Sequence, residues 1–584
     1  MARTVVALTA AAAAALTAAA AATPSPPSVA TLASAPQPVG PGTYQAPSVN
    51  NAWGSVQVSV ANVAAFNTYL VPPLSSGWLD PVESATLTVN GTTVPPAWTV
   101  WYPYSVVRGG NVTLPDGTLV AVTSELRMVF ESPVVLLAVN VTITAAASTG
   151  APAVALAVDF ATPTRYYPSA QSCPSWHYPT DSYACCFNWY PPVPSAPDTV
   201  GNFTYAWTRG GGGGGGGGWS LGVADAASPG VGAWAMGPGT PPPVSTGGSG
   251  ASWVVVGAGT TWQLQAVYAG ANTSVPAVTA AVAAVAAAWD SAWPDVVVDV
   301  QARFDAAFDA NGGGHFSGSL PLLSTDVAPL TQMYYLSVAS LLATERTNLP
   351  VPLSGLPCAA TGSGAPYQYQ VAHNVTAAAG GAYRYLRGVA GAALGGPAYA
   401  TDGGIMWITG APMNASTNVF YWDYSYAATA LAMLEPALLA RTLPLWMGSI
   451  DPDSGMPSYW SFWGYDYAAQ RGIGNYYAAN DFTLFGLAAA YLRSTGDVAW
   501  LDTTVVQAFP NGTAVANTTM HALLVDLALH WRSMNEVGNL ADYGGAPNLL
   551  ECVPSYINRV AGINAGNTWM MRALAEVEEG VYRN

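Results

Sequence analysis

The chain has 584 residues and a formal net charge of −16, with 8% charged and 51% hydrophobic side chains. Soluble domains carry about 25% charged residues on average, and this chain contains no lysine among its 16 basic residues. Such a scarcity of cations argues against nucleic acid and anionic lipid as partners. The 21 Trp and 30 Tyr residues exclude disorder caused by charge.

The N-terminus has the pattern of a secretory signal peptide. Arg3 precedes an Ala-rich apolar run, and small residues end the run before the Pro-rich segment that starts at Thr23. We predict a signal peptide over residues 1–22, with a signal anchor as the alternative, and a Pro-rich spacer over 23–40. The chain is then secreted or lumenal and leaves the membrane once the signal is cleaved.

Nine Asn-x-Ser/Thr sequons also fit a secreted or lumenal glycoprotein. They lie at Asn90, Asn111, Asn140, Asn202, Asn272, Asn374, Asn414, Asn511 and Asn517. The sequence gives no indication of the oligomeric state.

Three of the five cysteines lie in a single 14-residue stretch. Cys173, Cys185 and Cys186 share this stretch with His177. In an oxidising compartment we expect one local disulfide there. A zinc site is the alternative, although vicinal cysteines suit tetrahedral ligation poorly. The stretch is therefore expected to have a structural role. We expect no cofactor and no metal in the protein.

Residues 41–274 are predicted to form an antiparallel β-sandwich. Short runs rich in Val, Thr and aromatic residues alternate with turn signals: 86–89 precedes Asn90-Gly91, and 111–114 precedes Asp116-Gly117. Further strands are expected at 119–122 and 134–144. The glycine run at 210–218 is expected to be a surface loop.

The composition becomes helical near residue 275. An Ala/Val-rich run and an amphipathic stretch predict linker helices over 275–310. The remainder, 311–584, is predicted to be a helical domain whose loops form the mouth of a ligand site. Its candidate helices are 326–346, 379–393, 422–434, 436–447, 481–495, 518–534 and 555–579.

Isolated carboxylates lie among many aromatic residues between Phe420 and Phe482. Aromatic faces stack on sugar rings, and carboxylates bind sugar hydroxyls. An aromatic core is the alternative for most of these rings. A buried Asp in such surroundings has a raised pKa, which suits general-acid chemistry.

Three segments place acids where they can act. Asp423 follows Tyr421-Trp422 at a helix start, and Asp481 follows Asn480 at another. Both acids have a helix cap or first-turn acid as the alternative role. Asp542 and Glu551 lie in a later segment, where an ion pair with Arg559 competes as an account of Glu551.

The order of sandwich, linker helix and helical domain with Tyr421-Trp422-Asp423 and Asn480-Asp481-Phe482 resembles the six-hairpin (α/α)6-barrel glycosidases. The likeness is greatest to the processing α-glucosidases of the mannosyl-oligosaccharide glucosidase type, with trehalases more distant. Three further segments resemble stretches of uncharacterised glycosidase-like proteins: 311–320, 334–350 and 496–502. The resemblance implies a C-terminal (α/α)6-type helical toroid. The sequence provides only eight or nine helices for a ring that needs twelve, so either the loops at 350–420 contain further helices or the barrel is incomplete.

The resemblance implies an inverting exo-acting glycoside hydrolase with an oligosaccharide as its substrate. It makes Asp481 the general acid and Asp423 a ligand of the sugar hydroxyls. Glu551 is the best candidate for the general base, with Asp542 or Glu536 behind it.

Other side chains of the aromatic stretch and one histidine complete the expected substrate site. They are Tyr421, Trp422, Trp463, Tyr477 and His315, with Asp542 as a further contact if it is not the base. His315 has a structural role as its alternative. A catalytically inactive carbohydrate-binding glycoprotein and a carbohydrate phosphorylase or lyase on the same scaffold remain alternative functions.

Overall fold

The computed structural model describes twenty-seven stretches of the chain. They are residues 25–39, 48–51, 54–70, 79–81, 84–129, 134–145, 152–160, 164–166, 203–209, 219–225, 231–247, 249–271, 275–310, 316–343, 345–346, 351–352, 369–370, 406–407, 418–420, 425, 427–448, 450, 458–462, 473–476, 478–508, 514–544 and 558–583. All structural statements below concern these residues.

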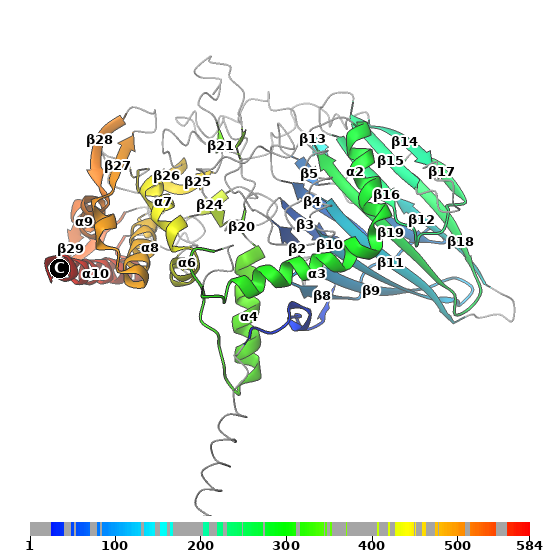
Figure 1. Cartoon of the computed structure of the whole chain (residues 1–584), viewed down its shortest axis with the longest axis horizontal. Helices are drawn as coiled ribbons and strands as arrows, with labels where there is room; N and C mark the ends of the chain where they lie inside the picture. The colour runs from blue at the N-terminus through cyan, green and yellow to red at the C-terminus, as the bar shows by residue number, and fades with distance from the viewer. Residues whose placement is uncertain are drawn as a thin grey trace, which may run out of the picture.

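A nine-stranded antiparallel sheet forms the centre of the N-terminal part (Figure 1). Its strands, in spatial order, are β1 (Gln37–Pro38), β8 (Trp98–Tyr102), β9 (Ser105–Thr113), β10 (Leu119–Met128), β11 (Val134–Ala145), β19 (Thr261–Ala271), β16 (Val231–Met236), β15 (Trp219–Asp225) and β14 (Phe203–Arg209). β1 lies within the range expected as a spacer and pairs with β8.

A five-stranded sheet packs on one face of the large sheet. Its order is β17 (Ser245–Gly247), β18 (Gly250–Val256), β12 (Ala153–Asp159), β6 (Thr86–Val89) and β7 (Thr92–Thr93). Inward side chains of both sheets, such as Leu137 and Val139 from one and Leu156 and Trp253 from the other, share one buried core. This is the β-sandwich expected from the sequence.

The remaining strands of the described residues form smaller antiparallel sheets. They are β2 (Ser48–Asn51), β3 (Gly54–Val58) and β4 (Phe66–Leu70); β5 (Leu79–Pro81) with β13 (Thr164–Tyr166); β20 (Glu345–Arg346) with β23 (Met406–Trp407); β21 (Val351–Pro352) with β22 (Tyr369–Gln370); β24 (Asn418–Phe420), β25 (Ser458–Phe462) and β26 (Ile473–Tyr476); β27 (Thr504–Ala508) with β28 (Ala514–Thr519); and β29 (Asn535–Val537) with β30 (Leu540–Asp542).

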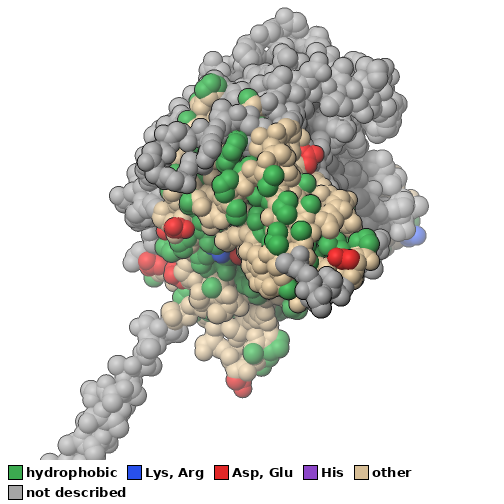
Figure 2. All heavy atoms as spheres, turned by 90° about the vertical axis from the view of Figure 1, so that its right-hand side faces the viewer, with side chains coloured by type: hydrophobic (Ala, Val, Ile, Leu, Met, Phe, Trp, Pro, Cys, Tyr) green, Lys and Arg blue, Asp and Glu red, His purple; other side chains and the backbone are tan. Residues whose placement is uncertain are grey.

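Burial explains the composition of the strands. β11 is wholly apolar over residues 134–139 because both of its faces are covered there: Leu137 faces the sandwich core, and Leu136 belongs to a second core shared with the helices. β12 alternates buried and exposed residues because its outer face meets solvent. Figure 2 looks onto this end of the molecule, where charged side chains are few and hydrophobic side chains are scattered. Val254 and Val256 on β18 are each more than half exposed.

Two helices connect the sandwich to the helical part. α2 (Val275–Ala287) covers the second face of the large sheet at β15, β16 and β19. α3 (Trp289–Ala306) then runs toward the other helices (Figure 1). No single helix among the described residues is long and apolar enough to cross a membrane; α2 and α3 meet that test only when taken together, and they are bent by 87° relative to one another.

The helical part contains six further α-helices in the described ranges. They are α4 (Ala328–Ala343), α6 (Ala428–Leu434), α7 (Pro436–Met447), α8 (Ala479–Thr495), α9 (Met520–Leu529) and α10 (Ala561–Arg583). α8 contacts α6, α7, α9 and α10, which makes it the central helix of this part. With α2 and α3 these make eight α-helices in the part of the chain that the structure describes, and a closed ring of six hairpins is not confirmed.

The 316–320 segment attaches the linker to the helices. The N–H of Gly318 donates to the carbonyl of Leu434 at 2.9 Å, and the hydroxyl of Ser317 donates to the buried carboxylate of Glu435, also at 2.9 Å. A Cβ added at Gly318 would lie 2.1 Å from the carbonyl oxygen of Met433. Only glycine therefore allows this segment to approach α6 so closely.

Candidate functional site

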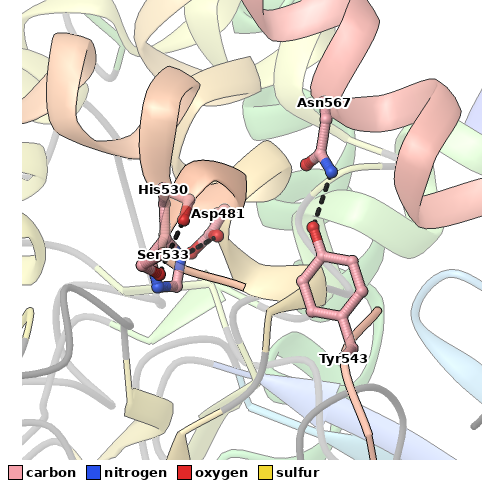
Figure 3. Close-up of polar contacts among 5 residues, drawn as sticks. All are labelled: Asp481, His530, Ser533, Tyr543 and Asn567. Atoms are coloured by element: carbon pink, nitrogen blue, oxygen red, sulfur yellow. Dashed lines mark hydrogen bonds and ion pairs between the residues drawn. The ribbon is translucent and has the colours of Figure 1, made fainter. Parts of the chain in front are cut away.

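Asp481 lies in the first turn of α8 and is almost fully buried, with 2% of its surface exposed. The helix is preceded by Ala478, which makes no side-chain cap. The carboxyl group of Asp481 does not cap the helix either. Its Oδ2 lies 2.6 Å from Nδ1 of His530, a residue 49 positions later in the chain (Figure 3).

His530 is placed by the end of α9. The side chain of Thr519 caps this helix by accepting from the N–H of Ala522, and His530 opens a short 3-10 helix, η7 (His530–Ser533), after α9 ends. The hydroxyl of Ser533 donates to the carbonyl of His530 at 2.8 Å and holds this turn (Figure 3). The imidazole is itself buried, with 6% of the residue exposed.

Burial raises the pKa of Asp481 to about 6, from an ordinary value of 3.8, because the charged carboxylate is removed from water. The hydrogen bond and the charge of His530 act in the opposite direction. Near pH 6 the carboxyl group is thus divided between its acid and carboxylate forms. Its second oxygen, Oδ1, is buried without a hydrogen-bond partner among the described residues.

Tyr543 stands on the other side of this site, after β30. Asn567 of α10 donates to its hydroxyl at 2.6 Å (Figure 3). Burial raises the pKa of Tyr543 to about 12; the hydrogen bond from Asn567 opposes the rise, and the charge of Asp481 adds to it. Tyr543 is therefore a neutral phenol at physiological pH, close enough to Asp481 to be affected by its charge.

Small side chains and one asparagine bring these elements together. Ala478 and Ala479 at the start of α8 pack against Ala541 and Tyr543. The side chain of Asn564 on α10 makes two hydrogen bonds to the backbone of Ala541: it accepts from the N–H at 2.8 Å and donates to the carbonyl at 3.1 Å. The site is thus built from the ends of α8 and α9, the β30 turn and α10.

Two further acids expected in the site, Asp542 and Glu536, lie within the described ranges, as does Asn480, which precedes Asp481. Asp542 is half-buried, and its Oδ1 accepts from the N–H of Gly544 at 2.9 Å, so it shapes the turn that carries Tyr543. Glu536 is exposed on β29. Asn480 is buried beside Asp481 in the first turn of α8.

The other expected site residues lie outside the described residues. They are His315, Tyr421, Trp422, Asp423, Trp463, Tyr477 and Glu551. The signal peptide and the Cys173–Cys186 stretch lie outside them as well. Their roles stay predictions.

Sequence reasoning missed His530, Tyr543 and Asn567 as neighbours of Asp481. A signal existed for His530, because it ends the apolar run of α9 and so falls on a helix end beside the core. Tyr543 was overlooked in favour of the acid next to it. Within the described ranges, no group of three or more His, Cys, Asp or Glu side chains could hold a metal ion.

Comparisons with known proteins give little sequence likeness. No protein-family model matches the chain, and no curated protein matches it.

The chain also matches solved structures at low scores, two of which are the following. A structure described as a kojibiose phosphorylase from the human microbiome has a TM-score of 0.40 and 8% identity, over 91% of this chain and 63% of its own. A bacterial glucoamylase complexed with acarbose has a TM-score of 0.37 and 9% identity, over 92% of this chain and 68% of its own. The chain thus spans less than two thirds of the length of the first.

Proposed function

We propose that the chain is a secreted or lumenal carbohydrate-active enzyme that cleaves glycosidic bonds by inversion, with Asp481 as the general acid. The observation that carries this proposal is the state of Asp481: a buried carboxyl group whose pKa is raised to about 6 and which is hydrogen-bonded to a buried histidine. Such a group holds a proton at mildly acidic pH and can release it to a leaving group.

The proposed reaction needs two carboxyl groups with different roles. Asp481 in its acid form gives its proton to the glycosidic oxygen as the bond to the sugar breaks. A second carboxylate removes a proton from the attacking water on the opposite face of the sugar. Glu551 is our candidate for this base, with Asp542 and Glu536 as the alternatives.

Access to Asp481 is part of the proposal. Because only 2% of this residue is exposed, a glycosidic oxygen reaches Oδ1 only when the chain around the carboxyl group moves. His530 then holds the carboxyl group through Oδ2 and leaves Oδ1 for the substrate. His530 is a positioning residue in this scheme, and Tyr543 is a neutral hydroxyl beside it.

The experiment that tests the function is a turnover screen of the full chain with product analysis. The substrates are aryl α- and β-glycosides and α-linked disaccharides such as maltose and kojibiose, each with and without inorganic phosphate. We expect hydrolysis of an α-glucoside that does not depend on phosphate, with the β-anomer as the first product in proton NMR spectra. Release of a sugar phosphate only when phosphate is present would favour a phosphorylase, and binding without turnover would favour the inactive sugar-binding protein.

The pH dependence tests the positioning role of His530. Activity depends on the protonated form of Asp481 and should fall as the pH rises through about 6. Since His530 lowers the pKa of Asp481, removing it should move this alkaline limb of kcat/KM to higher pH. We expect a smaller move in His530→Asn, which keeps a donor near the position of Nδ1, than in His530→Leu.

The same variants should lower kcat by about 10- to 100-fold at the wild-type optimum, because the carboxyl group loses its orientation. Measurement of kcat/KM from pH 4 to 9 gives both quantities. A limb that stays in place in both variants would show that His530 only fills space.

A further inference from the structure

A shallow groove of about 370 Å³ lies between α6, α8 and α10. Figure 1 shows these three helices side by side at the end of the molecule away from the sandwich. We propose that this groove binds a neutral sugar ring of an oligosaccharide, as a second carbohydrate site. The proposal goes beyond the catalytic role of Asp481 and does not depend on it.

The groove follows another face of α8 than Asp481. Phe482, Gly486, Ala490 and Arg493 line it and recur at the spacing of one helix stripe. Asp481 points instead into the contact with α9 and η7, about 100° around the helix from Phe482. The Arg493 end lies more than three helix turns from Asp481, so a ring bound there does not touch the acid.

An exposed tryptophan gives the groove an aromatic wall. Trp569 of α10 is 39% exposed and lines the groove together with Phe482. Its ring is fixed by an edge-to-face contact with Phe485, with 5.7 Å between the ring centroids. A partly exposed indole that packs on a buried ring is a platform on which the apolar C–H face of a pyranose can stack, because such a side chain loses little conformational entropy on binding.

Small residues leave room beside this platform. A Cβ added at Gly486 would lie 3.6 Å from Cη2 of Trp569, so the indole lies over bare backbone. Ala428 and Ala490 complete the apolar floor. The volume lies within the range of about 300–1,000 Å³ that is usual for small-ligand sites.

The hydroxyl side chains that line the groove are exposed and so form its rim, whereas Ala428 is buried and Ala490 is partly buried. Ser425 and Thr429 lie on the α6 side and Ser494 on the α8 side. Hydroxyl groups at this position can both donate to and accept from the hydroxyls of a sugar. An apolar floor with a polar rim fits a ligand that has one apolar face and polar edges.

The charges at the groove do not favour an ionic ligand. Arg493 is the charged residue in the groove lining, and its Nη2 is paired with Oε2 of Glu576 at 2.8 Å. Because the pair has no net charge, it does not favour phosphate or a uronic acid. A guanidinium beside a carboxylate offers donors and acceptors together, which matches neighbouring hydroxyls of a neutral sugar.

The test is isothermal titration calorimetry of the full chain with maltoheptaose as the probe. The parent protein carries Asp481→Asn to slow any turnover, and chromatography of the titrated mixture checks that the maltoheptaose stays intact. The heat then reports binding whether or not Asp481 is the catalytic acid. We expect millimolar or tighter binding. Trp569→Ala should weaken the affinity about tenfold through loss of stacking.

Arg493→Gln provides a second variant because Trp569 also packs on Phe485, and its loss could affect folding. Arg493 is exposed, and we expect the exchange to weaken the affinity about threefold. The matched control is Trp98→Ala on β8, where the tryptophan is 37% exposed, and its affinity should equal that of the parent. The proposal is overturned if maltoheptaose does not bind the parent, or if both groove variants bind it as tightly as the parent does.

Discussion

Replacing Asp481 with Asn is expected to lower kcat/KM for glycoside cleavage by about 10²- to 10⁴-fold, the usual contribution of a general acid. Asn keeps the shape of the side chain and a hydrogen bond to His530, but it has no acidic proton to give. The loss should appear in kcat and not in binding. Initial rates on the best substrate of the screen measure both.

The same exchange should stabilise the folded chain above pH 6. The pKa of Asp481 is about 6 in the fold against 3.8 for the ordinary group, so the folded state binds more protons between these values. Stability therefore falls as the pH rises through this window, by about 3 kcal/mol. Asn has no such loss.

Thermal unfolding at pH 4 and pH 7.5 measures the effect on stability separately from the loss of activity. The Tm advantage of Asp481→Asn should be larger at pH 7.5 than at pH 4. Asp502→Asn, at an exposed position outside the candidate site, serves as the control and should change neither activity nor the pH trend. A variant with wild-type turnover would remove Asp481 from the mechanism.

Replacing Gly318 with Ala is expected to cost about 2–4 kcal/mol of folding free energy. The new methyl group would lie 2.1 Å from the carbonyl oxygen of Met433, and a backbone atom at the end of α6 cannot give way as a flexible side chain could. The hydrogen bond from Gly318 to Leu434 would be lost as the segment moves away.

Chemical denaturation followed by circular dichroism measures this loss. Gly562→Ala is the matched control, because a Cβ at Gly562 near the start of α10 meets no atom within 4 Å. It should leave stability unchanged or raise it slightly, since Ala is the better helix former. Equal midpoints for the two variants would mean that the 316–320 segment can move without cost.

Local sequence signals predicted the elements whose shape is decided locally. The strand 86–89 and its turn are as expected, because Asn90 and Gly91 adopt the positive φ values of 49° and 76° that such a hairpin needs. The helix 436–447 also has the predicted bounds, since Pro436 starts it.

Boundaries that depend on packing were less predictable. The helix expected from 422 begins at Ala428, and the one expected over 518–534 consists of the end of β28, α9 and a 3-10 turn. Contacts with strands and helices that are distant in sequence set these limits, and the hydrophobic periodicity of a segment carries no information about such contacts.

The candidate site shows the same division. Asp481 could be selected because a lone acid in an aromatic, cation-poor stretch is expensive to bury. Its partner could not, because the pairing with His530 depends on how α8 and α9 are packed. Asp542 and Tyr543 illustrate the point: sequence reasoning chose the acid, whereas packing directed the neighbouring phenol to Asn567, where the charge of Asp481 affects its pKa.

The second face of the large sheet determines whether the sandwich and the helical part can be separated from one another. Leu136 and Val267 of the strands belong to the same buried cluster as Leu484 of α8 and Leu527 of α9. A fragment that contained only the helices would leave the apolar residues of α2 and α3 without their strands, and the sandwich alone would present a bare apolar sheet. The two halves are therefore not interchangeable modules, and a natural or designed recombination of this chain has to inherit them together.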